Sequence, residues 1–191
     1  MSANYETTYG ADQNGLIWGY HFKPGQPALL LDSSQALSFI QTPEHERPGE
    51  FLWLHFSLSH ASATPWLRKH CALPDEYYET MQEAAGSTRV EQDGDTLIAV
   101  INDVQFDFTL DSSSIASTSI AVDKFLFISA RLKPLRSIDQ LRKAVRSDTP
   151  FRSTPELLAH LLQDQAEVLV EILRVSTQRV GRIEDQLLSN R

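Results

Sequence analysis

The sequence contains one cysteine, Cys71, in 191 residues. A lone cysteine cannot form a disulfide within its own chain, which fits a protein that works in a reducing compartment. Cys-x-x-Cys and His-x-x-x-His spacings are also absent from the sequence. The sequence therefore offers no local motif for a structural zinc site.

Export signals and long apolar runs are missing as well. The first residues include Glu6 and Asp12 and lack an apolar stretch of the kind that a secretion signal contains. Apolar runs stay well below the eighteen or so residues that a membrane-spanning helix needs. We therefore expect no segment of this chain to cross a bilayer.

The sequence contains no glycine-rich phosphate loop, no Gly-x-Ser-x-Gly and no His-Glu-x-x-His. The formal net charge of −8 argues against nucleic acid as a partner, because phosphate binding needs a basic face. An acidic protein attracts cations instead. We expect neither an enzyme nor a resident cofactor, and no nucleic-acid partner.

The most informative stretch runs from Pro155 to Arg191. Ser153-Thr154-Pro155-Glu156 is a helix start, with a hydroxyl cap, a proline in the first turn and an early acid. Gly181 is its only weak point, so the stretch predicts one helix about 55 Å long. A heptad stripe follows it in steps of four and three: Leu162, Ala166, Leu169, Leu173, Ser176, Val180, Ile183 and Leu187.

A second apolar stripe covers only the first half of this segment: Leu157, Leu158, Leu161, Val168 and Ile172. The two stripes predict a helix that is packed on two sides at first and on one side later, as it leaves its own domain and joins other copies. The periodic pattern continues to the last residues without a stop signal, as expected for a piece of a longer chain.

The rest of the chain alternates between strand and helix patterns. Strands are predicted at residues 16–22, 28–31, 51–56, 89–91, 96–110, 119–122 and 125–131, and helices at 33–40, 65–71, 74–85 and 135–146. The run at 51–56 is mostly apolar, as in a strand buried on both faces. In the strand at 96–110, Ile98 and Val100 share the core face, and Asp103, Gln105 and Asp107 share a face that is wet at its far end.

These elements predict an α+β or α/β fold, namely an α/β/α sandwich with a mixed, largely antiparallel sheet. The sandwich would occupy residues 1–150, and a long C-terminal stalk helix would occupy residues 151–191. The tryptophans Trp18, Trp53 and Trp66 are expected in the core.

The order of these signals resembles a known family. It comprises the Phe51–Phe56 strand, Pro65-Trp66-Leu67, Leu73-Pro74, Arg89-Val90-Glu91 before a Gly-Asp hairpin, the run from Phe125 to Arg131 followed by Pro134-Leu135, and the long final helix. This order is similar to the cytosolic part of the CorA-type divalent metal ion transporters, and to their ZntB-type branch more than to magnesium-transporting CorA. The basic segment from Leu135 to Arg146 stands where the magnesium branch has an acidic helix pair, which also favours the ZntB-type branch.

The resemblance implies a homopentamer whose domains form a funnel on the cytoplasmic side of the cell inner membrane. Two membrane spans with a Gly-Met-Asn motif between them would follow Arg191, and the cargo would be zinc or another divalent cation. A magnesium or cobalt transporter of the same fold is one alternative. A stand-alone oligomerisation module without a membrane role is the other.

Glu156, His160 and Asp164 are the candidate metal ligands, because they recur every four residues near the start of the stalk and share one helical face. Neighbours in this row lie about 6 Å apart along the helix axis, so adjacent pairs could chelate one ion. Zinc takes four ligands, and the pair would need a neighbouring subunit or water to complete the site. The alternative is a solvated helix face that contains a histidine.

Other clusters are weaker candidates for a metal site. His55, His60, His70 and Cys71 are better explained as core, capping or helix-surface residues. The row Asp103, Asp107, Asp111 is spaced about 13 Å apart along a strand, too far to share an ion. Asp93-Gly94-Asp95 lacks the rest of a calcium loop and predicts a hairpin turn.

Overall fold

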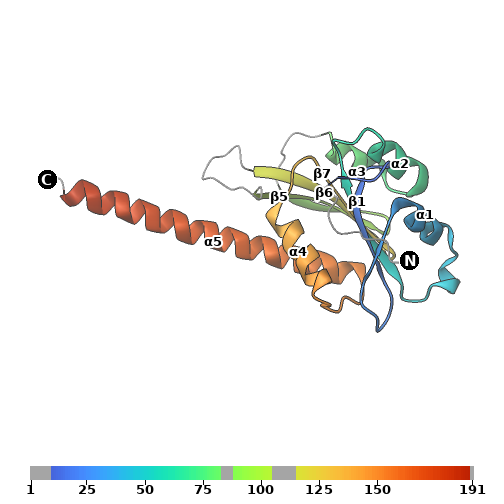
Figure 1. Ribbon diagram of the computed structural model, residues 1–191. Coiled ribbons are helices and arrows are strands. Elements are labelled where there is room, and N and C mark those ends of the chain that lie inside the picture. Colours follow the sequence, from blue (N-terminus) through green and yellow to red (C-terminus); the bar gives the residue numbers. More distant parts are fainter. Residues whose placement is uncertain (1–9, 83–87, 105–114, 190–191) are drawn as a thin grey trace.

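The computed structural model describes residues 10–82, 88–104 and 115–189. It contains seven strands and five α-helices in the order shown in Figure 1. The strands are β1 (Leu16–Phe22), β2 (Leu29–Leu31), β3 (Phe51–Ser57), β4 (Arg89–Asp93), β5 (Thr96–Val104), β6 (Ile115–Val122) and β7 (Leu126–Arg131). The helices are α1 (Ser33–Gln41), α2 (Ala63–His70), α3 (Asp75–Thr80), α4 (Arg136–Arg146) and α5 (Thr154–Ser189), with a 3₁₀ turn η1 at Glu44–Glu46.

The seven strands form one sheet in the order β2-β1-β3-β7-β6-β5-β4. The β3–β7 pair is parallel, with His55 opposite Ser129, and every other neighbouring pair is antiparallel. β3 lies inside the sheet, between β1 and β7, and six of its seven residues are buried. This confirms the strand buried on both faces that the apolar run predicted.

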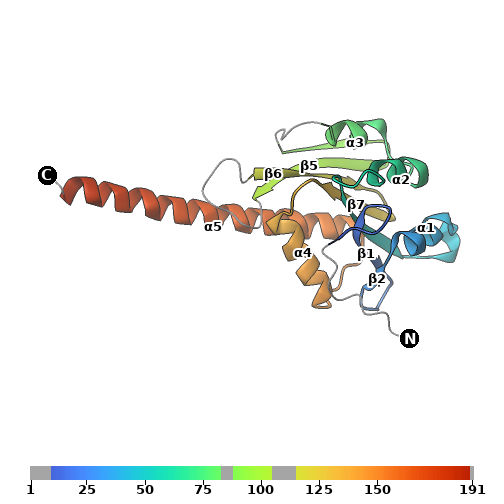
Figure 2. The ribbon, with the colours of Figure 1, turned by 45° about the horizontal axis from the view of Figure 1, so that its top comes forward.

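Helices cover both faces of the sheet, which confirms the α/β/α sandwich (Figure 2). One core lies under α1, α2 and α3 and includes Phe39, Trp66 and Tyr77. The other lies under α4 and the first half of α5 and includes Trp53 and Leu161. All three tryptophans are buried, as expected.

Turn and capping residues fix several element ends. Asp32 accepts hydrogen bonds from the backbone of Ser34 and Gln35, and the Gln35 side chain accepts one from the Asp32 amide, so α1 begins with a capping box. The β4–β5 hairpin turns at Gly94, whose φ of 54° lies in the left-handed region that glycine favours. The Asp93-Gly94 pair thus forms the predicted hairpin.

Some predicted bounds differ from the structure. α2 begins at Ala63, two residues before the expected Pro65, since proline is tolerated throughout the first turn of a helix. α3 ends at Thr80, and residues 83–85 of the predicted helix lie outside the described residues. The same holds for the end of the strand predicted at 96–110, including Gln105 and Asp107, and for Asp111 after it.

Asp103 is the clearest correction. We expected it on a wet face, but only 3% of its surface is exposed. α4 covers this part of β5, and the Asp103 carboxylate accepts a 2.7 Å hydrogen bond from the Ser137 amide in the first turn of α4. A carboxylate that caps a helix N-terminus is stabilised by the free amides there, which explains how a charged residue is buried at this point.

Candidate functional site

α5 is a single helix of 36 residues, as the sequence predicted, and it begins inside the domain and extends out of it (Figure 1). Its first residue is anchored to the sheet, since the Thr154 hydroxyl donates a hydrogen bond to the carbonyl of Asp123 in the β6–β7 turn. Leu157 and Leu161 are buried against the sheet and α4, and Val168 is buried further along the helix. Gln165 Nε2 donates a 2.6 Å bond to the Asn102 carbonyl at the end of β5. The first half of α5 is therefore part of the domain core.

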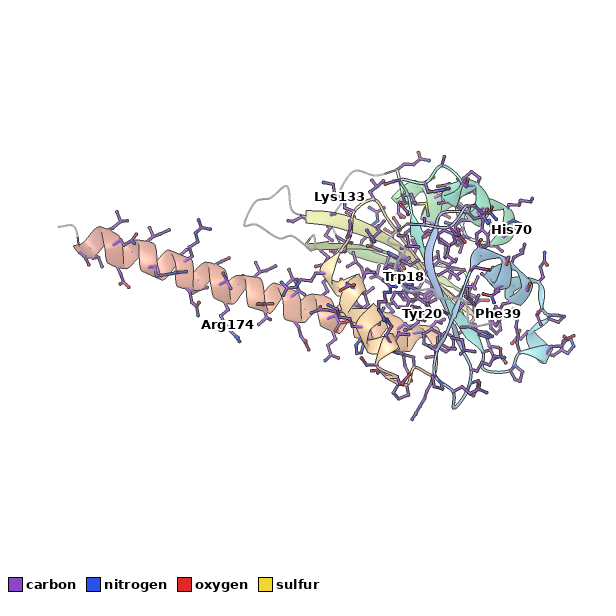
Figure 3. All side chains as sticks on the ribbon, viewed as in Figure 1. Trp18, Tyr20, Phe39, His70, Lys133 and Arg174 are labelled. Carbon is purple, nitrogen blue, oxygen red and sulfur yellow. The ribbon has the colours of Figure 1, made fainter. Side chains whose placement is uncertain are left out.

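The second half of α5 has no such support. Among the residues that the structure describes, no residue of this helix after Val168 is buried. Leu173 and Leu187 of the heptad stripe are 66% and 67% exposed. Side chains project from this half in all directions into open space (Figure 3). The heptad stripe, which is apolar except for Ser176, is therefore a face that the described part of the chain does not cover.

The structure brings together two of the three predicted metal ligands. His160 Nε2 and Asp164 Oδ2 lie 3.7 Å apart on one face of α5. The Asp164 Oδ2 atom is buried and has no hydrogen-bond partner among the described residues. Glu156 is oriented differently, because its carboxylate accepts a 2.7 Å bond from the Arg152 amide just before the helix. The described residues contain no group of three or more His, Cys, Asp or Glu side chains placed to hold an ion.

The pKa of Asp164 depends on its surroundings. Burial raises the pKa of Asp164, and the nearby Glu167 raises it further, while His160 acts in the opposite direction. Phe151 packs edge-on against the His160 ring with the ring centres 5.3 Å apart. A positive charge at His160 or a bound cation would therefore stabilise the ionised form of Asp164.

A polar network under α4 was not foreseen from the sequence. Arg131 Nε donates a 2.8 Å bond to His55 Nε2, so the ring proton must be on Nδ1, which lies 2.7 Å from Ser129 Oγ. Ser129 Oγ also accepts a 2.9 Å bond from Trp53 Nε1. Burial and the positive charges of Arg131 and Arg142 keep the pKa of His55 well below its ordinary value. This neutral His55 is a structural residue, not a metal ligand.

The other weak candidates also have structural explanations. His60 lies in the turn before α2, where its Nδ1 accepts a 3.3 Å bond from the Ser62 amide. His70 packs against Trp66, with the ring centres 5.1 Å apart. Cys71 is buried, and burial raises the pKa of its thiol to about 12, so the thiolate is not available as a ligand.

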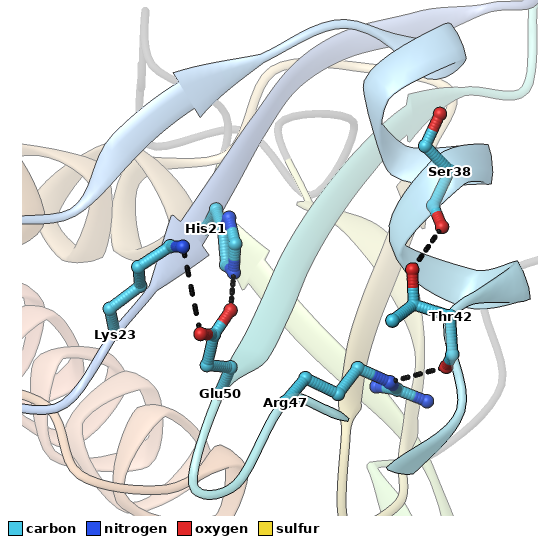
Figure 4. Close-up of polar contacts among 6 residues, drawn as sticks. All are labelled: His21, Lys23, Ser38, Thr42, Arg47 and Glu50. Carbon is cyan, nitrogen blue, oxygen red and sulfur yellow. Dashed lines mark hydrogen bonds and ion pairs between the residues drawn. The ribbon is translucent and has the colours of Figure 1, made fainter. Parts of the chain in front are cut away.

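A surface hollow of about 400 Å³ lies between β1, β2, α1 and η1 (Figure 4). Glu50 lies in it and already has two partners, His21 at 2.6 Å and Lys23 at 3.6 Å. Arg47 donates to the Thr42 carbonyl and is stacked on the rings of Phe39 and Phe125. Glu50 and Arg47 are therefore engaged in holding the walls of this hollow together.

Comparison with known proteins identifies the family. Residues 48–191 match the family described as CorA-like Mg²⁺ transporter protein. The divalent cation transporter CmaX of Pseudomonas aeruginosa is 25% identical to this chain over 163 residues, which cover 83% of this chain and 48% of CmaX. The chain thus spans about half the length of this relative.

Two solved structures share the fold. The full-length CmaX structure superposes with a TM-score of 0.78 at 20% identity, covering 92% of this chain and 52% of that one. The cytoplasmic domain of ZntB from Vibrio parahaemolyticus superposes with a TM-score of 0.67 at 18% identity, covering 88% of this chain and 65% of that domain. Both similarities extend over most of the sheet and helices described above.

Within the described ranges 10–82, 88–104 and 115–189, no helix is both long and apolar enough to span a membrane. α5 has the length but carries many charged and polar residues along its second half. Because the family match covers 144 of the 191 residues (48 to 191), the chain belongs to the CorA-like Mg²⁺ transporter family and is not an enzyme.

Proposed function

We propose that this chain is the cytoplasmic domain of a divalent cation transporter of the cell inner membrane, and that α5 connects it to membrane spans beyond Arg191. The observation that carries the proposal is the course of α5, which is anchored in the core at one end and projects out of the domain at the other (Figure 1). A helix of this kind can carry a change in the domain to a distant pore. The greater length of CmaX supports the presence of further segments.

The domain assembles through the heptad stripe, and we propose a pentamer. An apolar stripe on a helix that has left its own core needs a partner, and other copies of the same helix supply a matching one. Val170, beside the stripe, is also exposed and apolar, which widens the face. A wider face, with Ile183 at a d position followed by Leu187 at an a position, suits assemblies of more than two helices.

Zinc is the proposed ion, and His160 with Asp164 is its proposed site on this domain. Two donors of a tetrahedral zinc ion stand about 3.3 Å apart, whereas adjacent ligands of octahedral magnesium stand about 2.9 Å apart. The observed 3.7 Å is closer to the zinc value, and imidazole suits zinc better than magnesium. Water or a neighbouring subunit would fill the other positions, and Glu156 would join only after releasing the Arg152 amide.

Transport is tested on the complete protein. The full-length gene product, reconstituted in vesicles, should take up Zn²⁺, with Mg²⁺ and Co²⁺ measured in parallel. Faster Mg²⁺ or Co²⁺ flux would favour the magnesium or cobalt alternative. Absence of flux for all three ions, together with self-association of the 191-residue chain, would favour the stand-alone oligomerisation module.

The metal site is tested separately by calorimetry on this chain. Zn²⁺ binding should weaken about tenfold or more in His160→Ala and in Asp164→Asn, since each substitution removes one of two protein ligands. His70→Ala is a matched control, because it removes a histidine from another helix. Equal Zn²⁺ binding by the parent and all three variants would rule out the site.

A further inference from the structure

Two charged residues flank the heptad stripe in the exposed half of α5. Arg179 immediately precedes the stripe residue Val180, and Glu184 immediately follows the stripe residue Ile183. In heptad terms these are a g and an e position, on opposite sides of the apolar seam. The other charged residues of this half lie farther around the helix: Glu171, Arg174, Arg182 and Asp185.

Neither residue has an opposite charge within reach on its own helix. The positions three and four residues from Arg179 hold Val175, Ser176, Arg182 and Ile183, and those around Glu184 hold Val180, Gly181, Leu187 and Leu188. Both residues are exposed, and neither forms an ion pair with any other residue in the described part of the chain. By contrast, Asp139 and Lys143 on α4 pair at 2.9 Å with the usual spacing of four.

We infer that Arg179 pairs with Glu184 of an adjacent copy, and that this pair sets α5 helices parallel and in register. The inference rests on the proposed assembly through the heptad stripe and specifies its geometry. In parallel helices, a g side chain lies beside the e side chain five residues further along its neighbour. Helical side chains lean toward the N-terminus, so Glu184 of the neighbour reaches back toward Arg179.

Other arrangements lose this pairing. In antiparallel helices g positions face g positions, where Arg179 would meet Ile172, Gln186 or another Arg179, and no acid. A slip of one heptad would place Arg179 beside Thr177 of the neighbour. Among these arrangements, the parallel in-register one is therefore the one in which both charges find a partner.

The experiment uses charge reversal in the 191-residue chain and one introduced thiol. Leu187→Cys places this thiol on the stripe near the end of α5, and the native Cys71 is buried and unreactive. Disulfide formation between two copies of residue 187 requires parallel, in-register helices, because an antiparallel arrangement would separate the two thiols along the axis. Sedimentation of the same proteins without the introduced thiol gives the association midpoint, which is the protein concentration at which half of the chains are associated.

Arg179→Glu and Glu184→Arg should each raise the association midpoint about fivefold to tenfold, since an exposed attractive pair becomes a repulsive one at every interface. Both should slow the crosslink through the introduced thiol, and the double swap Arg179→Glu with Glu184→Arg should restore it. Arg174→Glu is the matched control: it makes the same charge change about 130° from the seam and should leave both readouts unchanged (Arg174 is labelled in Figure 3).

Two negative results have different meanings. Association that persists unchanged in Arg179→Glu and Glu184→Arg would overturn the pair and leave the proposed assembly standing. A parent protein that does not associate at any concentration, and whose Leu187→Cys form does not crosslink, would overturn assembly through the stripe, and the pair with it.

Discussion

The two halves of α5 have similar sequences and opposite environments. Both are rich in leucine and valine at heptad or near-heptad spacing. Leu161 in the first half is fully buried, whereas Leu173 in the second half is 66% exposed. The difference does not arise from helix propensity or amphipathicity, since one uninterrupted helix contains both.

The comparison separates the apolar residues of α5 that pack within this domain from those that the described part of the chain leaves uncovered. The first half is bounded by the sheet, by α4 and by the bond from Gln165 to β5. The second half is tied to the domain near its start by the ion pair between Arg136 and Glu171, which is 3.1 Å long and largely exposed. An exposed pair of this kind contributes at most about 1 kcal/mol. The second half therefore has little support from the described part of its own chain.

The largest expected effect contrasts Leu161→Ala with Leu173→Ala. Removing the buried Leu161 side chain should lower the free energy of unfolding by about 3 kcal/mol, because it leaves a cavity in the core. The same change at Leu173 should cost the isolated domain less than about 0.5 kcal/mol. Urea denaturation at low protein concentration measures both. Equal losses in the free energy of unfolding would mean that Leu161 and Leu173 do not lie in different environments.

A second test measures how the stability of the layer beneath α4 depends on pH. The folded chain keeps His55 neutral, and the unfolded chain protonates it below about pH 6.5, so stability should be complete above that pH and fall as the pH is lowered. The loss approaches about 1.4 kcal/mol per pH unit for this one group. His55→Gln keeps an acceptor for Arg131 and should show a shallower pH dependence.

Leu173→Ala serves as the control for that experiment, because it lies in the exposed half and should keep the wild-type slope. His21, whose pKa is also lowered by burial, adds a contribution of the same sign that both variants retain. A His55→Gln variant as pH-sensitive as the wild type would show that His55 is not the group responsible.

Gly181→Ala should strengthen only the exposed half. Apart from the neighbouring backbone of its own helix, a methyl group at this position would meet no described atom within 4 Å, and glycine costs a helix interior about 1 kcal/mol relative to alanine. We expect higher helicity by circular dichroism and slower amide exchange in the turns around Gly181, with the urea midpoint of the domain unchanged. A shift of that midpoint would mean that the second half unfolds together with the core.

The smallest expected effect is a gain in stability from Asp164→Asn. The raised pKa of Asp164 means that the folded chain tolerates the charged carboxylate less well than the unfolded chain does. Stability is therefore lost as the pH rises through the window between the two pKa values, and the penalty remains at neutral pH. Without metal, the variant should gain less than about 1 kcal/mol at neutral pH and nothing in strong acid. Loss of stability at neutral pH would contradict this.

Features encoded locally were predictable from the sequence. The start and length of α5 follow from Thr154-Pro155 and the scarcity of helix breakers after them, and both apolar stripes follow from spacing alone. The burial of β3 follows from its apolar run. Each of these properties depends on residues close together in the chain.

Features created by tertiary contacts were not predictable in the same way. Alternation along β5 placed Asp103 on a wet face, but its burial depends on where α4 docks. The His55 network depends on the parallel register of β3 with β7, which brings together residues 74 and 76 positions apart. Likewise, the spacing of four residues placed Glu156, His160 and Asp164 in one row. It gave no sign that the Glu156 carboxylate accepts a hydrogen bond from the Arg152 amide.

The bond from Thr154 to the β6–β7 turn fixes the root of α5 beneath the sheet. Because α5 is packed in the core as far as Val168, the arm that projects from the domain is residues 169–189, about 32 Å long. A tilt of about 5° where this arm leaves the core would carry its far tip sideways by nearly 3 Å. A small shift at the edge of the domain is thus magnified at the end of the helix.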